Sequence, residues 1–224
     1  MNKFALACIV STILLASCAS AQTASAGTVP ALREVHGQTI ISKNLPAADL
    51  TFSKDFRYIG GHIVNLYGNA EAEQHLFVKG RIDGAVERFY WVQFEHFLPT
   101  NKMTYDYGAG RTTDIGGLQF TYDVKSWPDY AAMQDEDPAS DGAAIKRMLA
   151  QENLTFPQRT VRVRMFHLPT PDRRTELMII YGEALPQGSP VPVRKEGVEL
   201  DKEAPDAARV MLEDARRDLI IRRR

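Results

Sequence analysis

The chain has 224 residues, of which 44% are hydrophobic and 25% are charged, and its 27 basic and 28 acidic residues give a formal net charge of -1. This length is enough for one globular domain with a substantial buried core, and the balanced charge disfavours a dedicated nucleic-acid binder, which would carry a basic excess. Both cysteines, Cys8 and Cys18, lie close to the N-terminus. The rest of the sequence therefore offers no thiol for a disulfide framework, a cysteine nucleophile or a thiolate metal site.

Residues 1–18 have the pattern of an export signal. A single lysine precedes residues 4–15, an apolar stretch of signal-peptide length that is too short to span a bilayer comfortably. The segment Leu15-Ala16-Ser17-Cys18 follows and resembles the lipobox of bacterial lipoprotein precursors, in which the cysteine is acylated and becomes the mature N-terminus. The resemblance covers only this segment. It implies lipidation at Cys18 and attachment to a membrane through an N-terminal lipid anchor.

The cellular location follows from the same segment. In lipoprotein precursors the residue after the cysteine influences sorting, and Ala19 in place of an aspartate implies the outer membrane, on the periplasmic side of the bacterial cell envelope. The alternative is ordinary signal cleavage after Ala26, because Ala24-Ser25-Ala26 has a small-x-small pattern. That cleavage would give a soluble secreted protein.

The chain after the signal divides into a predicted tether and a predicted domain. Residues 19–50 are predicted to be the tether, because Pro30, Gly37 and Pro46 would interrupt any regular element. One globular domain, residues 51–224, would follow. It begins with three predicted strands joined by short turns, which indicates an antiparallel meander. These strands lie at residues 56–67, 74–79 and 86–98, with Gly60-Gly61 marking a bulge in the first and Asp83-Gly84 a hairpin turn before the third.

The third of these strands is the most aromatic segment of the chain. Successive side chains of a strand point to opposite faces. One face would carry Tyr90, Val92, Phe94, His96 and Leu98, and the other Phe89, Trp91, Gln93, Glu95 and Phe97. Both faces are largely apolar, which is typical of an interior strand that is covered on both sides. His96 is accordingly predicted to be a core histidine, and a buried Gln93 and Glu95 would need hydrogen-bonding partners.

The remaining elements complete the predicted fold. Further strands are predicted at residues 102–107, 118–124, 160–168 and 176–181, where β-branched and aromatic residues are frequent. Ser140 or Asp141 would cap a helix that runs to about residue 152, and a last helix is predicted from about Pro205, a good first-turn residue. These elements predict an α+β fold. Its mostly antiparallel, curved sheet would have six or seven strands, with one helix after the fifth strand and a second helix at the C-terminus.

A curved sheet closed by a helix could enclose a ligand cavity. Phe89, Trp91, Gln93 and Glu95 would line it, as a mostly apolar wall with few polar groups. The favoured prediction is therefore a non-enzymatic envelope lipoprotein that binds an apolar or amphipathic small molecule, or an envelope protein partner, without a cofactor. A structural scaffold with a filled core is a further alternative.

Glu95 is the one candidate for catalysis. Burial would raise the pKa of Glu95, as a general acid requires, so the alternative function is a periplasmic hydrolase or isomerase that uses Glu95 as acid or base. The partner for such a reaction is not identified by any spacing in the sequence. The simpler interpretation is that Glu95 pairs with Arg57 or Arg81, or reaches water at the end of its strand.

Other motifs give little support for specific chemistry. The 5 histidines do not have the spacing of a familiar zinc motif, so no metal site is predicted. Arg162, Arg164, Arg173 and Arg174 could form a basic patch for an anionic head group or an acidic partner, although a solvated strand face is the simpler interpretation.

Overall fold

Two antiparallel sheets form most of the computed structural model, which describes residues 29–80, 84–134 and 137–224. The strands of the larger sheet are β1 (Val29–Pro30), β5 (Arg57–Leu66), β6 (Ala70–Gly80), β7 (Val86–Phe97), β8 (Arg111–Ile115), β9 (Leu118–Trp127), β10 (Thr160–His167), β11 (Thr175–Ala184) and β12 (Val198–Glu199). Those of the smaller sheet are β2 (Glu34–His36), β3 (Thr39–Ser42), β4 (Ala48–Phe52) and β13 (Leu219–Arg223). The helices are α1 (Tyr130–Met133), α2 (Asp141–Gln151), α3 (Leu200–Glu203) and α4 (Pro205–Arg217).

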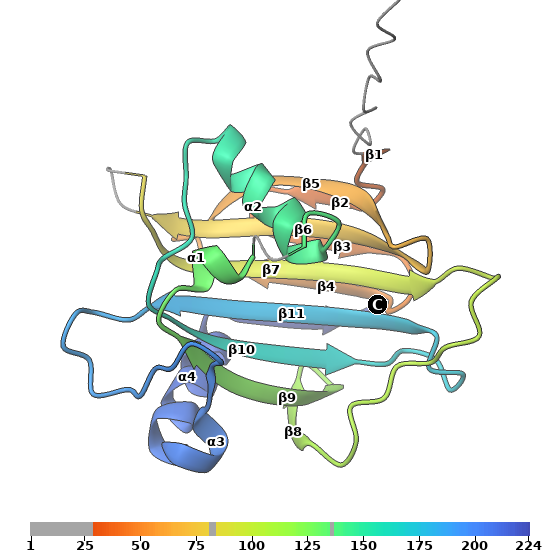
Figure 1. Ribbon diagram of the computed structural model, residues 1–224. Coiled ribbons are helices and arrows are strands. Elements are labelled where there is room, and N and C mark those ends of the chain that lie inside the picture. Colours follow the sequence, from red (N-terminus) through yellow and green to blue (C-terminus); the bar gives the residue numbers. More distant parts are fainter. Residues whose placement is uncertain (1–28, 81–83, 135–136) are drawn as a thin grey trace, which may run out of the picture.

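The larger sheet is the central layer of the molecule. Its strands run in the order β1-β5-β6-β7-β11-β10-β9-β12, with β8 also paired to β9, and the smaller sheet has the order β13-β4-β3-β2. Figure 1 shows α1 and α2 in front of the larger sheet and the smaller sheet behind it. The larger sheet is therefore covered on both faces, which explains why its central strands are apolar on both sides.

Strand β7 lies between β6 and β11, in the middle of this layer. On one face, Tyr90 and Val92 belong to a core cluster that includes residues of the smaller sheet and of α4. On the other face, Phe89 and Trp91 pack in a second cluster with Ile145 of α2. The prediction of an interior strand covered on both sides is confirmed.

Several predicted elements are confirmed in detail. The meander is formed by β5, β6 and β7, and the register of β5 with β6 shifts between Tyr58 and Gly60, at the predicted bulge. The strands predicted at residues 160–168 and 176–181 correspond to β10 and β11, which pair as an antiparallel hairpin. Ser140 caps α2 by accepting a hydrogen bond from the backbone of Ala143, and α4 begins at Pro205. Asp83, in the predicted hairpin turn, lies outside the described residues.

The predicted α+β fold with six or seven strands is wrong, because the protein is mostly β and has two sheets. The smaller sheet is the main difference. Residues 34–50, expected to be part of a tether, contribute to β2, β3 and β4, and their Ile40 and Leu50 are completely buried in the core. Gly37 and Pro46 do interrupt regular structure, but they lie in the turns between these short strands.

The C-terminus also differs from the prediction. Helix α4 ends at Arg217, and the chain continues as β13, which pairs with β4. Leu219 and Ile221 are buried while Ile220 between them is exposed, so this short strand has the alternation of a half-covered sheet edge. The arginine-rich end of the chain is thus part of a strand and not the last turn of a helix.

The predicted export signal, the lipobox with Cys18 and the alternative cleavage site after Ala26 all lie outside the described residues. Among the residues that the structure does describe, no helix has both the length and the apolar character that crossing a membrane requires.

Candidate functional site

The four residues predicted to line a cavity are placed together on the α2 face of β7. Phe89, Trp91 and Gln93 are at most 2% exposed, and Phe89 and Trp91 fill the core beneath α1 and α2. Glu95 is 9% exposed and is the only one of the four that borders the pocket described below. The four residues therefore lie together as predicted, but three of them are packed in the core and do not line a cavity.

Hydrogen bonds satisfy the polar side chains in this group. Gln93 accepts from the indole N–H of Trp91 (3.1 Å) and from the amide of Gln74 (2.8 Å). It donates to Oε2 of Glu95 (2.6 Å), and the hydroxyl of Tyr105 donates to Oε1 of the same carboxyl (2.7 Å). Arg57, one of the two expected partners of Glu95, instead pairs with Glu152, and Arg81 lies outside the described residues.

A second buried carboxyl faces Glu95 from the neighbouring strand. Glu176 of β11 lies directly opposite Glu95 in the antiparallel register, and it is 3% exposed. The hydroxyl of Tyr107 donates to Glu176. Burial, followed by the charge of Glu95, raises the pKa of Glu176 to about 8, and burial also raises the pKa of Glu95. We call Glu95 and Glu176 the acid pair, and we infer that it retains a proton at neutral pH.

The acid pair is covered by residues 98–110, which we call the tyrosine loop. The rings of Tyr105 and Tyr107 continue a row of aromatic stacking that runs from Phe97 to Phe166, with centroid separations of 4.4, 6.5 and 3.9 Å. This segment includes the predicted strand at residues 102–107. The strand prediction is wrong, because the backbone of Tyr105 bonds to the carbonyl of Arg173 in a loop and its side chain is buried by stacking.

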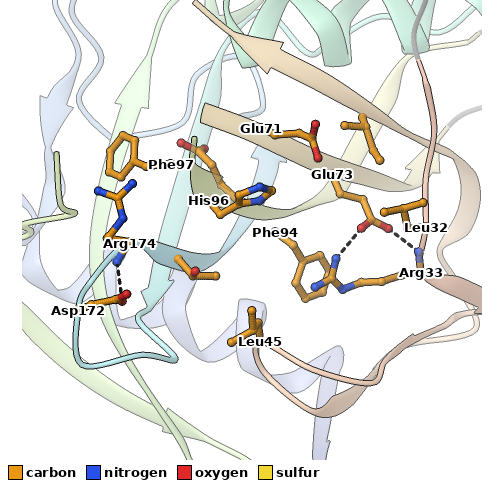
Figure 2. Close-up of a pocket in the computed structure, with 13 residues that line it drawn as sticks. Leu32, Arg33, Leu45, Glu71, Glu73, Phe94, His96, Phe97, Asp172 and Arg174 are labelled. Carbon is orange, nitrogen blue, oxygen red and sulfur yellow. Dashed lines mark hydrogen bonds and ion pairs between the residues drawn. The ribbon is translucent and has the colours of Figure 1, made fainter. Parts of the chain in front are cut away.

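A pocket of about 400 Å³ opens at the C-terminal end of β7, and we call it the end pocket. Its apolar wall is formed by Leu32, Leu45, Ile63, Phe94 and Phe97. Figure 2 shows Arg33 and Glu73 on one side and Phe97 and Arg174 on the other, with Phe94 and His96 between them. Leu32 is 77% exposed and Leu45 42%, although most large apolar side chains are buried. The end pocket therefore has an exposed apolar rim.

One side of the end pocket is a fixed ion pair. Arg33 donates to both carboxylate oxygens of Glu73, through its backbone N–H (2.6 Å) and its guanidinium (2.5 Å), and the guanidinium lies 3.6 Å from the ring centroid of Phe94. His75 also lies within 3.0 Å of Glu73. Burial alone would raise the pKa of Glu73, but the hydrogen bonds from His75 and Arg33 and the charge of Arg33 lower it to about 2. Glu73 is thus ionised, and both of its carboxylate oxygens are already bonded to Arg33.

Two polar side chains of the end pocket are open for a ligand. Glu71 of β6 and His96 of β7 are directly opposite each other in the register, and both line the pocket. Within the described part of the chain, neither side chain has a hydrogen-bonding or ionic partner. His96 is exposed, so the prediction of a core histidine is wrong. Strand β7 reaches the edge of the covered region at this residue.

The four arginines considered for a basic patch do not form one, and burial of Arg162 shows that the simpler interpretation, a solvated strand face, is also wrong for that residue. Arg162 is buried with its guanidinium 4.5 Å from the ring centroid of Trp127, while Arg164 pairs with Asp123 and Arg173 with Asp106. Arg174 borders the end pocket and donates to backbone carbonyls of the tyrosine loop. Among the described residues, no group of three or more His, Cys, Asp or Glu side chains is arranged to hold a metal ion.

The fold and the site together define a mostly β, two-sheet protein with a small end pocket beside a buried acid pair. No protein-family model matches the sequence, and searches of curated proteins and of solved structures give no significant match.

Proposed function

We propose that this protein is a non-enzymatic lipoprotein of the bacterial cell envelope that binds an apolar or amphipathic small molecule in the end pocket. The observation that carries the proposal is the exposed apolar rim of Leu32 and Leu45 above a pocket floored by Phe94. A pocket of about 400 Å³ falls in the range of small-molecule sites, which have mostly apolar walls and a few polar groups that orient the ligand.

Two features of the rim support ligand binding. A single exposed leucine needs no explanation, but Leu32 and Leu45 lie on the same pocket. Leu45 also has a φ of 51°, a left-handed conformation that branched side chains rarely adopt. Residues retained in such conformations are frequent at binding sites.

The polar end of the ligand would face Glu71 and His96. These groups can accept and donate hydrogen bonds, whereas Glu73 is occupied by Arg33 and the guanidinium of Arg174 by backbone carbonyls. An amphipathic molecule would then place its apolar part against Leu32 and Leu45. Anchoring at the outer membrane through Cys18 rests on the N-terminal sequence, and it would hold the pocket near lipids and other amphipathic compounds.

The acid pair supports a second candidate function. Glu176 supplies the second carboxyl that a hydrolase or isomerase using Glu95 would need, and burial raises the pKa of both carboxyls, as is frequent at acid–base sites. Glu176, however, is buried beneath the tyrosine loop and does not border the end pocket, so a substrate could contact both carboxyls only after the loop had moved. The open end pocket therefore favours binding.

The proposal is tested by titrating the full-length protein with N-phenyl-1-naphthylamine, an apolar fluorescent probe. We expect saturable binding that Leu45→Asp weakens by about tenfold, because a leucine buried by a ligand contributes roughly 1.5 kcal/mol. Val210→Asp is the matched control, since Val210 is also 42% exposed but lies on α4. Equal affinity of the two variants, or no saturable binding by the unmodified protein, would contradict the proposal.

A further inference from the structure

The acid pair lies among groups that do not neutralise two negative charges. Tyr105 and Tyr107 face it from the tyrosine loop, Arg164 from β10 and Asp141 from the start of α2. Arg164 is already bound to Asp123, with a contact of 2.5 Å, and Asp141 would add further negative charge. Like charges on directly opposite residues of an antiparallel pair are destabilising, and burial strengthens the repulsion. The acid pair is therefore stable only while it retains a proton.

The tyrosine loop is joined to both the acid pair and the end pocket. Its hydroxyls bind Glu95 and Glu176, as described above. Phe97 borders the end pocket and stacks on Tyr105. Arg174 also borders the pocket, and its guanidinium donates to the carbonyls of Leu98 and Met103, each at 3.0 Å. Phe97 and Arg174 of the pocket wall are thus positioned by contacts with the tyrosine loop.

We propose that the tyrosine loop is a latch for the wall of the end pocket, closed while the acid pair retains a proton and released when both carboxyls ionise. Two ionised carboxylates side by side repel each other and need more hydrogen-bond donors than Tyr105, Tyr107 and Gln93 supply, and opening of the tyrosine loop gives both of them water. Phe97 then loses its stacking partner and Arg174 its carbonyl acceptors, so the wall loosens. Since the pKa of Glu176 is about 8, release occurs as the pH rises above that value. The inference rests on the proposed function, because it assigns regulation to the same pocket.

The latch is tested by hydrogen exchange of the full-length protein at pH 6.5 and 9.0 without added ligand, after correction for the intrinsic effect of pH on exchange. The reporter is the amide of Tyr105, which bonds to the carbonyl of Arg173 at 2.8 Å. Its protection is expected to fall by about tenfold at pH 9.0, which is about one unit above the pKa of Glu176. The Glu176→Gln variant has no ionisable group at this position, so the protection of the Tyr105 amide should not fall at pH 9.0.

The matched control is Glu183→Gln. Glu183 is also on β11 and also accepts a tyrosine hydroxyl, from Tyr181 at 2.6 Å, but it does not belong to the acid pair. This variant should respond to pH as the unmodified protein does. If Glu176→Gln does not fold, Tyr107→Phe replaces it, and loss of that hydroxyl should lower the protection already at pH 6.5. Protection that is independent of pH in the unmodified protein, or unchanged by Tyr107→Phe, would overturn the proposal.

A separate measurement tests whether opening of the tyrosine loop changes ligand binding in the end pocket. The dissociation rate of N-phenyl-1-naphthylamine should increase severalfold between pH 6.5 and 9.0 in the unmodified protein and stay constant in Glu176→Gln. A rate that is the same at both pH values, while the loop opens, would overturn the latch. Absence of any probe binding would instead contradict the proposed function, while the hydrogen-exchange result would still report on the loop. Failure of the proposed function and failure of the latch are therefore distinguishable.

Discussion

Glu95 and Glu176 lie directly opposite each other on β7 and β11, and both are almost fully buried, with exposures of 9% and 3%. A pair of carboxyls in this position is a source of pH dependence at one end of the two central strands of the larger sheet. Each carboxyl accepts a hydroxyl hydrogen bond from the tyrosine loop, so the state of the pair is linked to the order of a surface segment.

The free energy of unfolding should decrease between pH 5 and pH 8. Burial raises the pKa of Glu176 to about 8 in the folded protein, whereas the ordinary value of 4.5 applies when the chain unfolds. The folded state therefore binds more protons in this range, and the stability that Glu176 contributes at low pH is lost as the pH rises. Urea denaturation at several pH values measures the effect. Glu176→Gln should flatten the slope, and an equal slope in this variant would contradict the assignment.

Glu73→Gln should lower the free energy of unfolding by about 1–3 kcal/mol, because it leaves the mostly buried Arg33 guanidinium without its charged partner. Glu34→Gln is the control. Glu34 also pairs with a cation, Lys43 at 2.8 Å, but both side chains are more than half exposed, so little change is expected. Urea denaturation of both variants at pH 7 gives the comparison. Similar losses in the two variants would show that the Arg33–Glu73 pair does not act as a buried pair.

Trp91→Ala should lower the free energy of unfolding by about 3–5 kcal/mol, as expected for removal of a large buried aromatic side chain. Trp91 is 2% exposed and fills the core under α2. Leu32→Asp, at the pocket rim, should change stability little because Leu32 is 77% exposed. Thermal and urea denaturation distinguish the two. A small loss for Trp91→Ala would argue against the packed core and in favour of the cavity that the sequence predicts there.

The sequence predicts the centre of the fold better than its edges. Alternation in the aromatic run places Phe94 and Glu95 on opposite faces of an interior strand, and it indicates that Gln93 and Glu95 need partners. The carboxyl of Glu176 opposite Glu95 could not be identified, because pairing between β7 and β11 depends on strand register, which residue spacing does not provide.

The smaller sheet and the rim of the end pocket escape prediction for a different reason. Strands β2, β3 and β4 have 3 to 5 residues each, too short for a clear period of alternation, and Gly37 and Pro46 between them suggest an irregular segment. Arg33 and Leu45, which border the pocket, come from the same region. Tyr105 and Tyr107 have a high intrinsic strand propensity, yet their stacking with Phe97 and Phe166 determines their conformation.

The most direct test of ligand binding in the end pocket is native mass spectrometry of the full-length protein, purified gently from a bacterial host. The account predicts a co-purifying small-molecule mass that is present in the unmodified protein and in Val210→Asp but absent from Leu45→Asp. A protein mass without any bound molecule, or a bound molecule that Leu45→Asp retains in full, would contradict binding at the rim of Leu32 and Leu45.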